Sequence, residues 1–367
     1  MTNTGKKRFS IIIPCYNAED YVDRALESAV RQSFDKNNYE IIAVNDASTD
    51  GTLQKLYRWQ EKYPELISVI TYEVNLRQGG ARNRAMKEAK GEYICFLDAD
   101  DRLSISCLDT YNNIIEITGA DMVVSKHIDE NELVYPNYDV AEAFDLNASA
   151  LNVSSSSASE KGLIRDESKI EKIYKNDKDI KKIILSDFGY VWCAAYRRDI
   201  IIENDIMFPE HLAYEDIYWP RIYRLYAKTI CVCNEVTHYR YNNPVSTMNK
   251  KNAAHHLDRL TVCEKLLSKY GELDVLKNHY DELFRETMEI YYFNSYYMFF
   301  TRMDEIPDVY MRIRNEIYKF FPDWDKRYDD SYLPEFFRYM VKLLKRAVNV
   351  KPSELIPFKE ALLEIIG

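Results

Sequence analysis

The chain has 367 residues, a formal net charge of −10 and a pI near 5.3, an acidic balance that argues against non-specific nucleic-acid binding. Its hydrophobic fraction of 46% and charged fraction of 29% allow a sizeable core in two domains, or in one large α/β domain with an appendage. No apolar stretch approaches the ~20 residues that span a bilayer. Residues 1–8 are polar and basic, so we expect no signal peptide. The seven cysteines form no C-x-x-C pair, so we also expect reduced thiols and a cytoplasmic protein.

Four short apolar segments predict strands in the first hundred residues, at 9–13, 39–44, 67–72 and 93–97. Helices are predicted after the first three strands, beginning at 17, 51 and 81. Pro14 ends the first strand, Asn17 is a plausible N-cap, and residues 75–80 form a glycine-containing loop. This alternation predicts a mostly parallel α/β sheet with helices on both faces and with ligands at the carboxyl ends of the strands.

An acidic motif, D-A-D-D at 98–101, follows the fourth predicted strand. Alternation along an extended chain sends Asp98 and Asp100 to the same side. Carboxylates that close raise each other's pKa unless a cation neutralises them, and oxygen-only ligands suit Mg²⁺ or Mn²⁺. The alternative is a solvated acidic turn that caps the next helix.

The rest of the chain is less regular. Residues 131–180 contain little that forms a core and include a serine run at 154–157, which predicts a variable insertion or mobile segment. The chain is helical and aromatic-rich from 249 onward, with crowding at 291–300, so we divide it into domains at 1–248 and 249–367. Clustered aromatics predict contact through the second domain, in a homodimer or at a membrane surface. Ordinary core packing is the alternative.

Several segments together resemble glycosyltransferase family 2. They are residues 9–20 (FSIIIPCYNAED), 44–52 (VNDASTDGT), 75–84 (NLRQGGARNR), 96–101 (FLDADD), 214–216 (YED) and 238–241 (HYRY). The resemblance implies the GT-A fold, a Rossmann-like α/β sheet, and an inverting transfer from a nucleotide sugar. It also implies a UDP-sugar donor and an acceptor hydroxyl on a cell-surface polysaccharide, teichoic acid or glycoprotein glycan, whether lipid-linked or on protein.

The resemblance also implies a nucleotide site, made of Pro14, Tyr16, Asn17, Asp46, Arg77, Gly80, Asp98 and Arg240. In it Asp46 would accept the N3–H of uracil, a proton that cytosine lacks, and Asp98 would contact the ribose. Arg77 and Gly80 would bring a guanidinium and a backbone N–H to the nucleotide. The structural alternatives are an Asx turn for Asp46 and an ion pair with a carboxylate for Arg240. For Arg82 a contact with the nucleotide and a solvated position on the helix are equal alternatives, and this residue is left out of the predicted site.

The remaining implied roles concern metal and catalysis. Asp100 would hold Mn²⁺ or Mg²⁺ against the diphosphate, with His238 as a second candidate ligand or else a structural histidine, and Asp101 as a helix cap. Inversion requires a base on the face of the sugar opposite the leaving group, and Asp216 is the candidate, beside Glu215. The alternative is that both acids complement a helix dipole.

Two other functions stay open. A phosphatase of the haloacid dehalogenase type uses D-x-D-x-T/V early in the chain, whereas this motif reads D-A-D-D-R near residue 98. A non-catalytic sugar-nucleotide-binding protein would not need Asp46, Asp98, Asp100 and Asp216 together.

Overall fold

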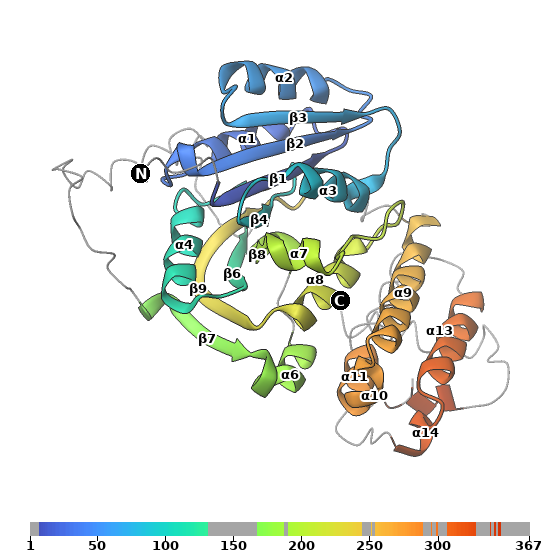
Figure 1. Ribbon diagram of the computed structural model, residues 1–367. Helices are drawn as coiled ribbons and strands as arrows, with labels where there is room; N and C mark the ends of the chain where they lie inside the picture. Colours follow the sequence, from blue (N-terminus) through green and yellow to red (C-terminus); the bar gives the residue numbers. More distant parts are fainter. Residues whose placement is uncertain are drawn as a thin grey trace.

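The computed structural model describes residues 7–130, 167–186, 190–243, 251, 254–288, 295, 299, 307–327, 338, 341–342 and 344–345. Its strands are β1 (Phe9–Cys15), β2 (Tyr39–Asp46), β3 (Ile67–Tyr72), β4 (Tyr93–Phe96), β5 (Arg102–Leu103), β6 (Met122–Asp129), β7 (Ile170–Lys175), β8 (Ala194–Arg197) and β9 (Thr229–Arg240). They form one nine-stranded sheet in the order β3-β2-β1-β4-β8-β6-β9-β5, with β7 paired to β9 (Figure 1).

Helices cover the sheet and extend beyond it. They are α1 (Val22–Val30), α2 (Thr52–Lys62), α3 (Arg77–Glu88), α4 (Cys107–Thr118), α6 (Asn176–Leu185), α7 (Arg198–Glu203), α8 (Glu215–Tyr226), α9 (Asp258–Glu272), α10 (Val275–Asn278), α11 (Tyr280–Glu286), α13 (Pro307–Phe320) and α14 (Trp324–Arg327). Short 3-10 turns are η1 (Lys36–Asn38), η3 (Glu167–Lys169), η4 (Val191–Cys193) and η6 (Ala254–Leu257).

Alternating side chains of the sheet build two cores. On β1, Ile11 and Ile13 pack into the core beneath α1 and α4, whereas Ile12 packs into the core shared with α3 and α8. A strand that is buried on both faces reads as a continuous apolar run, which is why this segment was recognisable in the sequence. The predicted α/β fold with helices on both faces is confirmed.

The sheet is mixed, which corrects the prediction of a mostly parallel one. β1, β2, β3 and β4 pair in parallel, and β6 is parallel to β9. β8 is antiparallel to both β4 and β6, and β5 and β7 are antiparallel to β9. The strand–helix alternation that supports a parallel prediction ends at β4, so the sequence pattern did not cover the later strands.

Three predicted boundaries also change. β1 continues through Pro14 instead of ending there. Ile12 is the last β1 residue that pairs with β4, so proline, which has no N–H to donate, is tolerated two residues further on. Helix α3 begins at Arg77, inside the predicted loop. Part of the predicted insertion is regular, because β7 lies within it and α6 begins within it, while residues 131–166 lie outside the described residues.

The C-terminal helices gather beside α8 (Figure 1), and α9 packs against it. One hydrophobic core continues from the sheet face through Trp219 on α8 to Leu260 on α9, Ile313 on α13 and Trp324 on α14. Of the aromatic segment 291–300, only Ser295 and Phe299 are described, and both are buried. No described helix is long and apolar enough to cross a bilayer.

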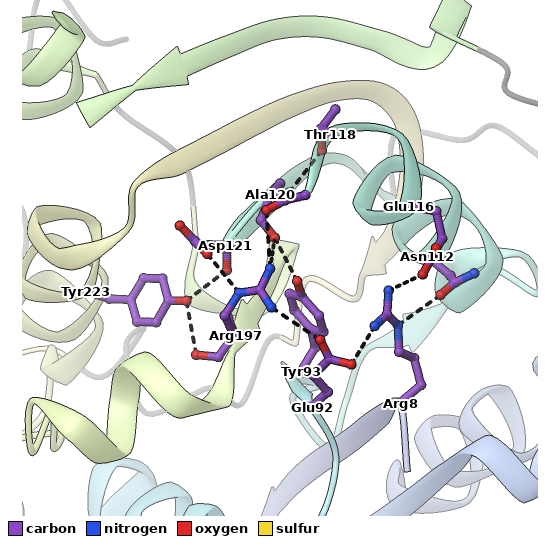
Figure 2. Close-up of polar contacts among 11 residues, drawn as sticks. Arg8, Glu92, Tyr93, Asn112, Glu116, Thr118, Ala120, Asp121, Arg197 and Tyr223 are labelled. Atoms are coloured by element: carbon purple, nitrogen blue, oxygen red, sulfur yellow. Dashed lines mark hydrogen bonds and ion pairs between the residues drawn. The ribbon is translucent and has the colours of Figure 1, made fainter. Parts of the chain in front are cut away.

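An ion-pair network links the amino ends of β1 and β4 to the last residue of β8 (Figure 2). Glu92, just before β4, pairs with Arg8 at 2.5 Å and with Arg197 at 3.2 Å, and Arg197 also binds Asp121 at 2.8 Å. The Tyr223 hydroxyl on α8 donates to the Asp121 carbonyl at 2.8 Å. These contacts fix β8 and α8 at the amino end of β4. The candidate site lies at the opposite, carboxyl end of this strand.

Candidate active site

The first, second and fourth strands deliver polar residues to one edge of the sheet. β1 pairs in register with β2 (Pro14 with Val44) and with β4 (Ile12 with Phe96), all in parallel. Their carboxyl ends therefore lie together, followed by Tyr16 after β1, Asp46 at the end of β2, and the acidic motif after β4. This is the edge at which open α/β sheets bind ligands.

The turn after β1 is tied to the turn after β2. Asn17 has φ +48°; its N–H donates to Ser48 Oγ at 3.1 Å and its Oδ1 accepts from the Thr49 N–H at 2.8 Å. Helix α1 begins only at Val22, so the prediction that Asn17 is a helix N-cap is wrong. Tyr16 is 49% exposed, while Pro14 is buried within β1.

Asp46 holds the start of α3. Its carboxylate is buried and accepts from the Leu76 N–H at 2.8 Å, and burial raises its pKa. This contact joins residues that are 30 apart in sequence, so it is not the local Asx turn of the structural alternative. A carboxylate has about four lone-pair sites, so capacity for a nucleobase N–H remains.

Close packing accounts for the glycines at the start of α3. A Cβ on Gly80 would lie 2.4 Å from Leu76 Cβ, and one on Gly79 would lie 2.5 Å from the Pro209 carbonyl. Arg77 has φ +61° and its guanidinium pairs with Asp258 of α9 at 2.7 Å. A contact of Gly80 or Arg77 with a nucleotide stays a prediction.

The acidic motif divides into three environments. Asp98 accepts from Arg82 Nη2 at 2.8 Å, and Asp100 accepts from Asn243 Nδ2 at 3.2 Å. Asp101 is buried and accepts from the Tyr241 N–H at 2.8 Å, so its prediction as a helix cap is wrong. Burial, with the Asp98 and Asp100 charges, raises the pKa of Asp101 to about 9.

Glu215 and Asp216 form the first turn of α8, after Tyr214 at φ +65°. Glu215 is 4% exposed and accepts from Arg82 Nη1 at 2.5 Å, whereas Asp216 stays partly exposed. Burial raises the pKa of Glu215 to about 7 and raises that of Asp216, while the positive charge of Arg82 opposes both shifts. The acids therefore do sit at a helix N-terminus, which suits their charge and leaves a catalytic role open.

Arg82 was left out of the predicted site, and the alternative of a solvated helix residue is wrong. The residue is 1% exposed, between Asp98 and Glu215. The available signal was the small-residue run around it, since Gly79, Gly80, Ala81 and Ala85 allow α3 to be buried on both sides. An arginine within such a helix needs a buried partner.

Two predicted residues have structural partners. His238 is fully buried, with Nδ1 at 2.8 Å from Thr237 Oγ1 and its ring 5.5 Å from that of Trp192. Burial lowers its pKa to about 3, and this environment favours the structural alternative over a metal ligand. Arg240 donates to both carboxylate oxygens of Asp129 at 2.6 Å, and this ion pair is the structural alternative given for it above.

The acidic motif has the chemistry of a cation site. Burial and the Asp98 charge raise the pKa of Asp100, which means that they disfavour its ionised form, and a divalent cation would offset that effect. No group of three or more His, Cys, Asp or Glu side chains in the described part of the chain is arranged to hold a metal. Asp100 thus offers one protein ligand, and a bound diphosphate and water would have to supply the others.

Carboxylates at the ends of parallel strands, facing a helix that begins with two further acids, define an α/β enzyme of the nucleotide-binding kind. The profile of Glycosyl transferase family 2 matches residues 10–204, more than half of the chain. The chain belongs to glycosyltransferase family 2, and the predicted family is confirmed.

Known relatives agree with this membership. A poly(ribitol-phosphate) beta-glucosyltransferase of Bacillus spizizenii is 42% identical over 120 residues, which are 32% of this chain and 19% of that protein; the matched part thus spans about a fifth of the relative. The uncharacterized glycosyltransferase YibD of Escherichia coli is 25% identical over 283 residues, 74% of each chain. The crystal structure of S. aureus TarS 1–349 in complex with UDP-GlcNAc has a TM-score of 0.66 at 21% identity, covering 98% of this chain and 91% of that one, and so shares the fold.

Proposed function

We propose that this protein transfers a sugar, with inversion, from a UDP-sugar to a hydroxyl group of a cell-surface polysaccharide or teichoic acid. The proposal rests on two ion pairs, which Asp98 and Glu215 both form with the guanidinium of Arg82. These pairs place the end of β4 beside the first turn of α8. Transfer needs such an arrangement, because a nucleotide sugar and an acceptor must be held against each other.

The nucleotide belongs at the β1–β2–β4 edge. Asp46 would accept the uracil N3–H with the lone pairs that Leu76 leaves free, and the exposed Tyr16 ring is available for stacking against the base. Asp98 would accept from a ribose hydroxyl. The crystal structure of TarS contains UDP-GlcNAc, and the Bacillus spizizenii relative is a poly(ribitol-phosphate) beta-glucosyltransferase. Both support this class of donor and acceptor.

The chemical step needs a base and relief of charge. Asp216 would take the proton of the attacking hydroxyl, and its carboxylate would favour the positive charge that develops on the sugar. A divalent cation, Mn²⁺ or Mg²⁺, held by Asp100 and the diphosphate, would offset charge on the departing nucleotide. A cytoplasmic location, and contact of the C-terminal helices with a second copy or a membrane surface, remain predictions.

A donor screen tests the proposal. The purified protein is incubated with individual UDP-, GDP-, ADP- and CMP-sugars and Mn²⁺ or Mg²⁺, and release of nucleotide is followed without and with teichoic-acid or polysaccharide fragments. We expect slow hydrolysis of one UDP-sugar, faster release with an acceptor, and loss of both on adding EDTA.

Asp100→Ala supplies the matched variant. Because it removes the one carboxylate proposed to hold the cation, UDP binding should weaken strongly in Mn²⁺ and resemble that of the wild-type protein in EDTA. UDP affinity that is equal with and without EDTA would refute the metal role. Binding of UDP-sugars without any turnover would instead favour the non-catalytic alternative.

A further inference from the structure

We infer that Arg82 is a positioning residue: one buried guanidinium joins Asp98 of the nucleotide side to Glu215 of the α8 side and so fixes where Asp216 stands relative to the donor. The inference rests on the proposed function, because it gives a role to the distance between the two sides. Arg82 itself has no proposed contact with substrate.

The geometry of Arg82 suits a bridge between distant segments. Its Nη2 donates to Asp98 Oδ1 at 2.8 Å and its Nη1 to Glu215 Oε1 at 2.5 Å, so two nitrogens of one planar group engage carboxylates that are 117 residues apart in sequence (215 − 98). A planar guanidinium presents its donors in a fixed fork, so the two carboxylates cannot drift independently.

The bridge is held from both sides by apolar and polar packing. The Arg82 guanidinium carbon lies 5.7 Å from the ring centroid of Phe96 and 5.4 Å from that of Phe208. The neighbouring Asn83 accepts from the Phe208 N–H at 2.8 Å and donates to the Phe208 carbonyl at 2.9 Å. These contacts fix α3 against the segment that leads into α8, so movement of Arg82 would require both elements to shift.

Charge adds to the geometric argument. The charged groups that face the two acids of α8 are Arg82 from α3, Asp98 from the end of β4, Arg259 from α9 and Arg221 within α8. Burial raises the pKa of Glu215 and Asp216, and the Arg82 charge is the largest influence that lowers them. The same residue that spaces the two sides therefore also favours ionised acids on α8.

The test uses Arg82→Lys in the full chain. Lysine keeps the positive charge but is a single ammonium group, so it cannot hold both carboxylates with the geometry of a fork. We expect kcat for transfer to fall by about 10²-fold, the loss that misplacement of reacting groups can cause, with the donor KM little changed. Donor hydrolysis, which needs no positioned acceptor, should fall much less than transfer.

The matched control is Arg224→Lys. Arg224 is also buried and also bound to a carboxylate, Glu286, but it lies at the other end of α8. Both variants should lower the melting temperature, while only Arg82→Lys should change the ratio of transfer to hydrolysis. An equal ratio in both variants and in the wild-type protein would overturn the inference.

A double-variant cycle separates this inference from the proposed function. The ratio of transfer to hydrolysis is measured for the wild-type protein, Arg82→Lys, Glu215→Gln and the double variant. Because the bridge links Glu215 to the nucleotide side, Glu215→Gln should lower this ratio in the wild-type background and have little further effect on it in the Arg82→Lys background. Additive effects of the two substitutions on the ratio would overturn the bridge alone, whereas a wild-type protein that neither binds UDP nor turns over UDP-sugars would overturn the proposed function.

Discussion

The two adjacent acids of α8 are chemically unequal, and this difference decides which of them suits a base. Glu215 is committed to a buried ion pair with Arg82, whereas Asp216 remains partly exposed. A base must reach the proton that it accepts, and a carboxylate already bound to a guanidinium is poorly placed to do so. We therefore assign the base to Asp216 and support of the site to Glu215.

Asp216→Asn should separate chemistry from binding. The amide keeps the shape of the side chain and removes its basicity, so transfer should fall by about 10²–10⁴-fold while UDP affinity stays near that of the wild-type protein. Steady-state transfer assays and calorimetric UDP titration measure the two quantities. Glu215→Gln should lower the melting temperature as well as the ratio of transfer to hydrolysis, because it leaves a buried cation with one carboxylate fewer and breaks the bridge through Arg82.

The pH profile of the wild-type protein provides an internal control for that assignment. Burial raises the pKa of Asp216, and a base is active only when deprotonated. Transfer should therefore decline as pH falls through this raised pKa, at a higher pH than an exposed aspartate would give. Retention of most transfer activity by Asp216→Asn would contradict the assignment and direct attention to Glu215.

Single residues differ in how far the sequence could reveal them. The roles of Asp46 and Asp98 could be predicted from the sequence, because both residues follow apolar runs and parallel strands bring their carboxyl ends together. The role of Arg82 could not be predicted, since its two partners lie 16 and 133 residues away and helical spacing cannot identify a partner on another element. The partners of Arg240 and His238 depend in the same way on later strands that the pattern did not predict.

At the scale of elements, α3 shows why a glycine-containing segment was interpreted as a loop. Glycine is a poor helix former, so 75–80 favoured an irregular structure on propensity alone. The structure instead has helix from Arg77, because α3 must approach the segment before α8 closely enough for Arg82 to reach Glu215. Tertiary contact overrides local propensity here.

Gly79→Ala tests this account of α3. The added methyl group would lie 2.5 Å from the Pro209 carbonyl, a backbone atom that cannot rotate away. Forcing an extra carbon into such packing costs about 1–3 kcal/mol of the free energy of unfolding. Denaturant titration measures that cost, and transfer activity should fall as α3 shifts.

Gly271→Ala on α9 is the matched control, since a Cβ there meets nothing within 4 Å. In that open helical site alanine should be neutral or stabilising, by up to about 1 kcal/mol. A Gly79 variant as stable as the Gly271 variant would show that α3 has room to spare, and would contradict close packing as the reason for the glycine.

At the scale of the whole molecule, the C-terminal helices share the core of the sheet. The sequence suggested a division at 249, because composition changes there, but composition does not report which apolar faces pack together. α8 contributes Trp219 to the core that also holds Leu260 and Trp324. Glu286 on α11 adds a polar link, accepting from Arg221 Nε at 3.0 Å and from Arg224 on the same helix α8.

Glu286→Ala should therefore destabilise the whole protein rather than release the C-terminal helices alone. Removing one partner of a buried ion pair costs about 3–5 kcal/mol, because the remaining charges stay buried without compensation. Here two arginines on α8 lose their shared carboxylate. Glu272→Ala is the control: it breaks the exposed pair with Lys269 and should change the free energy of unfolding by less than about 1 kcal/mol.

Tryptophan fluorescence reports on both parts of this core, since Trp219 lies on α8 and Trp324 on α14, and both are buried. Because Trp59 and Trp192 also fluoresce, the signal of each part is taken as the difference between the wild-type protein and one single variant, Trp219→Phe or Trp324→Phe. With a shared core, the two signals should unfold at one denaturant concentration, and Glu286→Ala should shift both by the same amount. Loss of the Trp324 signal well before that of Trp219 would mean that the C-terminal helices unfold on their own, and that α8 keeps its position without them.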